Sequence, residues 1–378
     1  MKNLMVVSSW VRLRPYEERV RREEAGECPR MSIFERVLES AVIDGAFRTS
    51  VPRPRRYLYA LLPRDVAMAL EAFIVRDRYS AVISWTDAGA LLFALLLKMT
   101  GTRKPHVALM FWISKPKKAL FLRFVSSHID RIILWTSTHR DFAMNRLEIP
   151  PSKIAFLPYY VDHLFFRPIP SARPSDTICS AGREMRDYPT LIRALRGLPI
   201  NCHIAAGNFR GRIEPTVRAI YEEGPLPPTI TVGMLTPREL RDLYRRSRFV
   251  VVPLHPTDSD NGLTVILEAM ASGKAVICSR VYGQRDIVID GETGMYVPPG
   301  DPDALREAVV YLWEHPAIAE EMGRLGRLHV ERRHTVDHFV SQVREIVEEV
   351  ATGSRPRDGM HLPAHTSARG TVLTPRTS

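Results

Sequence analysis

The sequence is poor in cysteine and lacks long apolar runs. Its cysteines form no CxxC pair and have no histidine at metal-ligand spacing; they are Cys28, Cys179, Cys202 and Cys278. This pattern argues against a disulfide framework or a zinc site and indicates reduced core thiols in a cytoplasmic protein. The longest apolar run, 88–97, has ten residues, whereas a membrane-spanning helix needs about 20. The run therefore predicts a buried or surface-docking helix.

Acidic residues are absent between Lys98 and Arg123, a stretch with seven basic residues and interleaved aromatic ones. Such a composition suits an anionic membrane surface or a lipid-phosphate acceptor. It also suits single-stranded nucleic acid, or a solvated basic face over an ordinary core in which Phe111 and Trp112 end a buried strand. We expect an anionic membrane surface or acceptor, and no nucleic acid.

The chain is long, rich in apolar residues and positively charged. The chain has 378 residues, more than the roughly 250–300 that one core usually serves, so two domains are expected. A hydrophobic fraction of 45% excludes a mainly disordered chain. The 53 Lys and Arg against 42 Asp and Glu leave a net charge of +11, which indicates an anionic partner.

Short apolar segments alternate with longer helical patterns along the chain, and this alternation predicts parallel sheets covered by helices. In the first half we expect strands at 4–8, 81–85, 107–111, 131–136 and 154–157. The alternation restarts at 177 and ends in a long helical stretch, 301–350. We therefore predict an α/β fold with two Rossmann-like domains facing across a cleft, the default ligand site. The expected domains are 1–165 and 166–350, with a last helix that can pack back on the first domain, followed by a disordered tail, 351–378.

The segment 253–277 contains a strand end, a polar loop and a helix that Gly273 terminates. Asn261 is a suitable N-cap for this helix, and Gly262 would let an anion approach the free backbone N–H groups. Glu268 lies about two turns further on the same face, where ribose hydroxyls would suit its carboxylate. The simpler alternative pairs Glu268 with a neighbouring arginine.

Asp260 lies at the mouth of this helix and could hold the hydroxyls of a second sugar, or could merely complement the helix dipole. Together with Asp258 and Ser259 it forms a DxD pattern, which is formally a metal signature. Three residues carry little information, and the helix start offers charge neutralisation without a cation. We expect no metal.

A second candidate anion site follows the strand at 177–181. Gly182, Arg183 and Arg186 lie at its carboxyl end, the edge at which parallel sheets bind ligands. Two arginines three residues apart can make bidentate contacts to phosphate oxygens. The alternative is a surface ion pair with Glu184 and Asp187, which explains one arginine more easily than both.

Residues 150–345, approximately, contain these segments and resemble the donor-binding domain of retaining GT-B glycosyltransferases of family four, the glycosyl transferases group 1. The motifs that carry the resemblance are Gly182-Arg183, 231–235 with 237–240, Asp260 with Glu268 through Gly273, 283–288, and 290–298. The segment 157–162 is similar to the interdomain crossing of that family.

The resemblance implies a retaining, metal-independent hexosyltransferase without a cofactor, which moves a hexose from a nucleotide-diphosphate sugar to a glycan or lipid-linked acceptor. Arg183 and Arg186 would stabilise the leaving diphosphate, Asp260 would contact the sugar, and Glu268 would hold the ribose. The remaining donor-binding positions implied are Gly182, Gly233, Met234, Leu235, Asn261, Gly262, Leu263 and Thr264. The expected location is the cytoplasm, with peripheral association at the inner face of the membrane.

The first half departs from the family pattern and would bind the acceptor. Ser8-Ser9-Trp10 stands where a Gly-rich loop is expected, and Phe111 or Trp112 replaces the usual active-site histidine. Asp260 replaces the usual glutamate. Two other functions therefore stay open: a nucleotide-sugar epimerase on the same fold, and a non-catalytic sugar-nucleotide-binding subunit.

Overall fold

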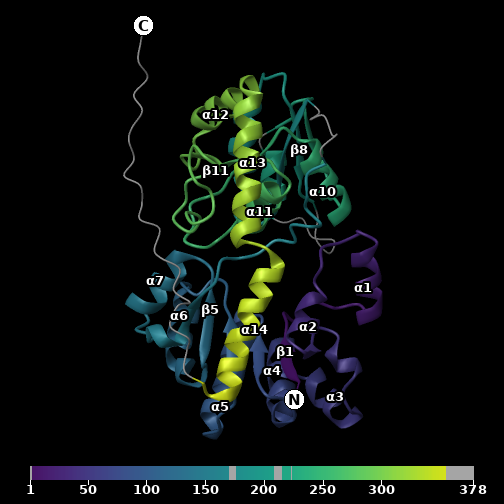
Figure 1. Ribbon diagram of the computed structural model, residues 1–378, viewed down its shortest axis with the longest axis vertical. Helices are drawn as coiled ribbons and strands as arrows, with labels where there is room; N and C mark the ends of the chain where they lie inside the picture. Colours follow the sequence, from purple (N-terminus) through teal and green to yellow (C-terminus); the bar gives the residue numbers. More distant parts are fainter. Residues whose placement is uncertain (1, 170–175, 208–214, 223, 355–378) are drawn as a thin grey trace.

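The computed structural model describes residues 2–169, 176–207, 215–222 and 224–354, which form two lobes (Figure 1). Six parallel strands make the first sheet, in the order β2-β1-β3-β4-β5-β6. They are β1 (Asn3–Val6), β2 (Ser40–Ile43), β3 (Val82–Ser84), β4 (His106–Leu109), β5 (Arg131–Leu134) and β6 (Ile154–Phe156). The helices of this lobe are α1 (Tyr16–Glu24), α2 (Ile33–Val37), α3 (Arg53–Ala60), α4 (Arg64–Val75), α5 (Asp87–Thr100), α6 (Pro116–Val125) and α7 (Ser137–Asn145).

The second sheet also has six parallel strands, in the order β12-β11-β10-β7-β8-β9. Its strands are β7 (Thr177–Ala181), β8 (Asn201–Ala205), β9 (Ile230–Val232), β10 (Phe249–Val252), β11 (Ala275–Ser279) and β12 (Gly294–Val297). The remaining helices are α8 (Tyr188–Leu195), α9 (Pro215–Glu222), α10 (Pro237–Arg246), α11 (Leu263–Ala271), α12 (Pro302–Glu314), α13 (Pro316–Arg333) and α14 (Val336–Thr352). Short 3-10 helices occur at Phe47–Thr49, Arg76–Arg78, Ser126–His128 and Pro151–Lys153.

The predicted α/β fold with two parallel sheets is confirmed. Its central strands β4, β10 and β11 are buried along their whole length, as parallel strands covered by helices on both faces must be. The sequence analysis missed the four-residue strands β2 and β12, which are too short to stand out as apolar runs. The predicted helical stretch 301–350 is interrupted twice, because Pro316 starts α13 and Thr335 caps α14 with its side chain.

The apolar run 88–97 forms most of α5. Within the described ranges, none of the helices combines the length and the apolar composition of a membrane-spanning segment. The four cysteines are free, and Cys179, Cys202 and Cys278 are buried in the second lobe. Burial raises the pKa of the Cys179 thiol to about 12, so this side chain is an inert part of the core at neutral pH.

Two segments connect the lobes and lie side by side. The chain first crosses near Val161 and returns between α13 and α14, and the backbones pair there: Val161 N–H donates to the His334 carbonyl at 2.8 Å, and Val336 N–H donates to the Val161 carbonyl at 3.0 Å. Helix α14 then packs against α2 and β4 of the first lobe (Figure 1). The described part of α14 extends to Thr352, and residues 355–378 of the predicted tail lie outside the described residues.

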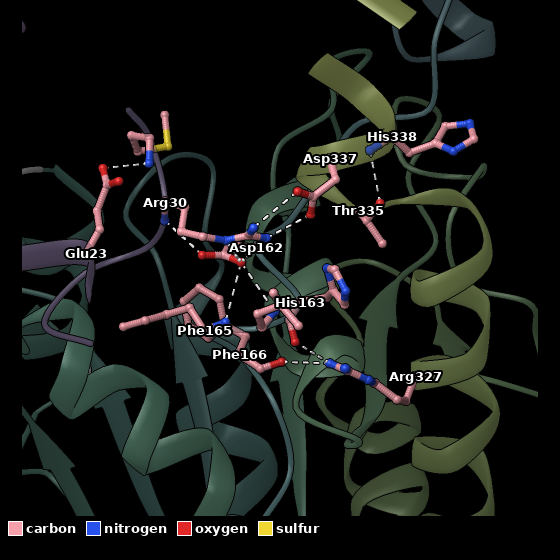
Figure 2. A network of polar contacts seen from close by, with 12 residues as sticks. Glu23, Arg30, Asp162, His163, Phe165, Phe166, Arg327, Thr335, Asp337 and His338 are labelled. Carbon is pink, nitrogen blue, oxygen red and sulfur yellow. Dashed lines mark hydrogen bonds and ion pairs between the residues drawn. The ribbon is translucent and has the colours of Figure 1, made fainter. Parts of the chain in front are cut away.

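Arg30 joins both crossings to the first lobe (Figure 2). Its guanidinium donates to Asp162 at 3.0 Å and to both carboxylate oxygens of Asp337, at 3.1 and 2.8 Å. The Asp162 side chain is only 3% exposed, and it also accepts from the backbone N–H of Arg30 at 2.8 Å. Burial opposes ionisation of Asp337, but the hydrogen bonds from Arg30 hold the pKa of this carboxyl below its ordinary value.

We expect Arg30→Ala to destabilise the protein by about 2–3 kcal/mol, because it leaves the buried Asp162 carboxylate without its cation. Urea-induced unfolding followed by circular dichroism measures this effect. Arg344→Ala is the matched control, since Arg344 pairs with Glu348 on an exposed face and should cost no more than about 0.5 kcal/mol. Equal losses in the two variants would show that the Arg30 cluster contributes no special stability.

Candidate functional site

The strand order of the second sheet reverses between β7 and β10, since β8 and β9 lie on one side of β7 and β10 on the other. The loops that leave the carboxyl ends of two such strands diverge and open a crevice, which is where open α/β sheets bind ligands. Here the two loops are 182–187 and 253–262. They are tied together by a bridge between Arg186 and Leu254 and by a hydrogen bond from His255 N–H to the Met185 carbonyl at 2.9 Å.

Arg186 is a buried part of the first loop and is 4% exposed. Its Nε donates to the Ala181 carbonyl at 2.8 Å and its Nη1 to the Glu184 carbonyl at 2.7 Å. The guanidinium lies against Gly182, where a Cβ atom would come within 2.3 Å of Nη2. Arg186 does not form the alternative ion pair with Asp187. The Asp187 carboxylate instead caps α8 by accepting a hydrogen bond from the Thr190 N–H.

Arg183 occupies the half-buried position directly after Gly182. It follows the carboxyl end of β7 in the first of the two loops, and its Nη1 atom is buried. The structure therefore gives the two arginines of the predicted pair different surroundings. Arg186 is held by backbone carbonyls, and its hydrogen bonds fix the turn that carries Arg183.

The helix after the second loop has a different N-cap from the one predicted. Asn261 is not its N-cap: Gly262 occupies that position with φ +93°, and Leu263 is the first helical residue. Glycine takes this left-handed conformation without a steric penalty, which explains why the turn uses it. The Asn261 side chain instead accepts from the Thr257 hydroxyl at 3.1 Å. At the amino end of α11 the N–H of Leu263 donates to the Asp260 carbonyl at 3.1 Å, and the N–H groups of exposed Thr264 and of Val265 follow it.

Glu268 lies half-buried on α11 and accepts a hydrogen bond from the Tyr244 hydroxyl at 3.0 Å. Burial raises the pKa of this carboxyl to about 7, although the Tyr244 hydrogen bond and the positive charge of Arg186 both lower it. Among the described residues no arginine forms an ion pair with Glu268, so the alternative of an arginine partner does not hold and the Tyr244 hydroxyl takes that place.

Both carboxylates of the DxD pattern contact tryptophans of the first lobe. The indole of Trp112 donates to Asp258 at 3.0 Å, and the indole of Trp135 donates to Asp260. The Ser259 hydroxyl also donates to Asp260, at 3.0 Å. Asp260 therefore does more than complement a helix dipole: it joins the two faces of the cleft. Within the described ranges, no cluster of three or more His, Cys, Asp or Glu side chains is arranged to hold a metal ion.

A second set of contacts across the cleft comes from the start of α7. Ser137 donates to Asp286 through its N–H and its hydroxyl, both at 2.8 Å, and Thr138 donates to the Tyr282 carbonyl at 2.9 Å. The sequence analysis assigned 283–288 to the family pattern but found no partner for it. The polar residues after β5 could have indicated this contact, because they follow the carboxyl edge of the first sheet, which faces the cleft.

His139, one turn into α7, is a further residue that the sequence analysis missed. It is 1% exposed, and its Nε2 has no hydrogen-bond partner in the described part of the chain. Burial lowers the pKa of this imidazole, whereas the carboxylates of Asp260 and Asp258 raise it. His139 is therefore a buried imidazole behind the start of α7, and it is not among the residues that line the cavity between the lobes.

Gly233, Met234 and Leu235 follow β9, at the same edge of the sheet as the crevice. Gly233 N–H donates to the Ile204 carbonyl at 3.1 Å. Met234 is 60% exposed, and a Cβ on Gly207 would meet its side chain at 2.4 Å, so Met234 covers the end of β8. Leu235 packs on the main core.

A cavity of about 960 Å³ opens between the two lobes. Ser259, Asp260 and Asn261 line its end in the second lobe, and Ser8 after β1 lines it in the first. Phe111 and Trp112 do not end a buried strand, because β4 stops at Leu109 and both rings line this cavity. The residues predicted to contact the sugar and those expected to face an acceptor thus share one space.

Part of the second lobe is similar to a known protein family. Residues 189–315 match the family model described as glycosyl transferases group 1. D-rhamnosyltransferase WbpZ of Pseudomonas aeruginosa is 45% identical over 83 residues, which is 22% of each chain. Across eight curated relatives, the aligned segment spans between 20% and 56% of the relative's length.

Solved structures extend the likeness to both lobes. Sucrose-phosphate synthase from Thermosynechococcus elongatus superposes with a TM-score of 0.70 at 18% identity, covering 94% of this chain and 100% of that one. Anabaena Alr3699/HepE, in complex with UDP-glucose, superposes with a TM-score of 0.69 at 15% identity, covering 92% of this chain and 100% of that one. Residues 189–315 therefore match glycosyl transferases group 1, and the shared architecture shows that the chain has the GT-B fold.

Proposed function

We propose that this chain is a retaining, metal-independent hexosyltransferase that uses a nucleotide-diphosphate sugar as donor and a glycan or lipid-linked molecule as acceptor. The observation that carries the proposal is the joined pair of loops at the strand-order reversal. The first loop carries Arg183, and the second carries Asp260 and leads into the amino end of α11. The names of the relatives, which include rhamnosyl- and mannosyltransferases, and the UDP-glucose bound to HepE support the same activity.

The chemistry needed is departure of a diphosphate from C1 of the sugar. As the C1–O bond breaks, its electron pair moves onto the β-phosphate oxygen, where Arg183 and the N–H groups of α11 stabilise the charge. The acceptor oxygen bonds to C1 on the same face, and its proton passes to the departing phosphate oxygen. Asp260 orients the sugar hydroxyls, and Trp135 holds the Asp260 carboxylate in place.

Glu268 would accept hydrogen bonds from the two ribose hydroxyls of the donor, which requires its ionised form. Because the pKa of Glu268 is about 7, this carboxyl is mostly protonated at pH 6 and mostly ionised at pH 8. We therefore expect the affinity for the best-binding nucleoside diphosphate to rise about tenfold between these pH values. Isothermal titration calorimetry at the two pH values measures this change in affinity.

Glu268→Gln provides the control for this pH dependence. The ligand phosphate also titrates near pH 6, and this contribution is the same in both proteins, so the difference between them isolates Glu268. An identical pH profile in Glu268→Gln would mean that the carboxyl does not act in donor binding.

We further propose that the Lys98–Arg123 region docks on an anionic membrane surface, with the protein at the cytoplasmic face. In this region Leu120 is 73% exposed and Met99 74%, beside exposed Lys117, and the adjoining Phe124 is 55% exposed. Apolar side chains next to lysines are typical of interfacial binding. Sedimentation with vesicles containing 30% phosphatidylglycerol should deplete the protein from solution, and pure phosphatidylcholine vesicles should not. Equal sedimentation with both would contradict electrostatic docking.

A panel of UDP-, GDP- and ADP-sugars incubated with the protein tests the main proposal. Transfer to an added acceptor, or slow release of the nucleoside diphosphate with free sugar, is the expected result. Interconversion of two sugars would instead show an epimerase. Tight binding without any turnover would show a sugar-nucleotide-binding subunit.

A further inference from the structure

The cavity between the lobes has an aromatic wall on the side of the first lobe. Phe34 packs on Trp85 with ring centroids 4.6 Å apart, and Trp85 lies 6.3 Å from Tyr160. Tyr160 packs on Tyr159 at 4.7 Å, and both line the cavity together with Leu91 and Leu92 of α5. A sugar acceptor would need polar groups along this wall, whereas the wall offers rings and aliphatic chains. The walls of the cavity therefore favour an apolar ligand portion.

Positive charge gathers at one rim of the cavity, at the start of α6. Lys118 forms an ion pair with Asp87, and Arg19 forms one with Glu35 at 2.6 Å, so these two cations are neutralised. Lys115 lies 4.0 Å from the centre of the Trp112 ring. Lys117 is exposed and forms no ion pair with any described residue. Two lysines without a carboxylate partner thus remain at the rim.

The same face of α6 continues from the rim out of the cavity. Lys117 and Phe121 line the cavity, and Leu120 and Phe124, one turn further along, are exposed. These four residues are spaced i, i+3, i+4 and i+7 and so share one side of the helix. An apolar chain that starts in the cavity can follow this side of α6 outward.

We propose that this cavity binds an amphipathic acceptor, with an apolar chain against the aromatic wall and a phosphate group at Lys115 and Lys117. The acceptor hydroxyl then faces Asp260 and Asn261, where the donor sugar would lie. The inference rests on the proposed transferase activity, because only a transferase has an acceptor. The binding of the amphipathic molecule itself does not depend on turnover. It selects the lipid-linked class over a purely polar glycan.

Binding of butyl, hexyl and octyl phosphate, measured by tryptophan fluorescence without donor, tests the inference. Burial of each methylene improves affinity by up to about fourfold, so octyl phosphate should bind at least about tenfold more tightly than butyl phosphate. Inorganic phosphate serves as the ligand without a chain. If all four ligands bind equally, the site takes a free phosphate and the inference is wrong.

Two variants separate the chain from the charge. Leu92→Trp fills the cavity and should flatten the dependence on chain length, whereas Leu61→Trp, at a side chain 85% exposed outside the cavity, should not. Lys117→Glu should weaken all the alkyl phosphates by about tenfold and keep the chain-length dependence. Lys2→Glu makes the same charge change at an exposed site outside the cavity and should have no effect.

The two proposals fail in different measurements. Absence of turnover with every donor, together with chain-length-dependent binding, would overturn the transferase activity and leave an apolar anion-binding cavity. Turnover together with binding that ignores chain length, or that Leu92→Trp leaves unchanged, would overturn the amphipathic acceptor. Circular dichroism and thermal unfolding of each variant identify any that does not fold.

Discussion

Arg183→Ala is expected to lower kcat for transfer or donor hydrolysis by about 10²–10³-fold. Arg183 follows Gly182 at the carboxyl end of β7, in the first of the two loops that are bridged at Arg186 and Leu254. In the proposed reaction it faces the phosphate oxygen on which negative charge develops. Such a cation stabilises the transition state more than the bound donor, so its removal should affect kcat more than the donor KM.

Steady-state kinetics with saturating donor measure the change in kcat, and two further variants serve as controls. Arg332→Ala removes an exposed arginine of α13 and should keep the activity of the parent protein. Arg183→Lys keeps a positive charge but loses the planar fork, so it should recover only part of the activity. Full activity of Arg183→Ala would remove Arg183 from the catalytic site.

Much of the fold could be predicted from the sequence, because parallel strands buried on both faces stand out as apolar runs between helical patterns. Strands such as β4 and β5 were found for this reason. The four-residue strands β2 and β12 were missed, since their pattern does not differ from that of a loop with a few apolar residues. The N-cap of α11 was misplaced by one residue, because the rule for N-caps favours Asn261 and does not foresee a left-handed turn at Gly262.

The two loops of the crevice could be picked out from the sequence, since each is a continuous segment next to a strand end. The contacts across the cleft could not, because their residues come together only in the folded chain. Trp135 and Asp260 are 125 residues apart in sequence, and nothing in either segment indicates the other. The surroundings of Arg186 were also out of reach, since a basic residue in a turn gives no sign that backbone carbonyls bury it.

The buried position of Arg186 makes Gly182→Ala a sharp test of the crevice. Gly182 has φ +101°, and an added Cβ would lie 2.3 Å from Nη2 and 2.7 Å from Cζ of Arg186. The guanidinium cannot move aside without losing its hydrogen bonds to the Ala181 and Glu184 carbonyls. We expect the turn that carries Arg183 to shift, with a fall in kcat of about 10²-fold and a loss of about 2–4 kcal/mol in the free energy of unfolding.

Gly197→Ala separates this effect from backbone strain alone. Gly197 also has a left-handed conformation, with φ +80°, but a Cβ there would meet nothing within 4 Å. The control should therefore lose only the left-handed penalty of about 1–2 kcal/mol and keep its kcat. Urea unfolding and donor turnover, measured on both variants, give the comparison. If Gly182→Ala lost no more stability and activity than Gly197→Ala, the close packing of Arg186 against Gly182 would have no part in holding the crevice, and Arg183 would need another support.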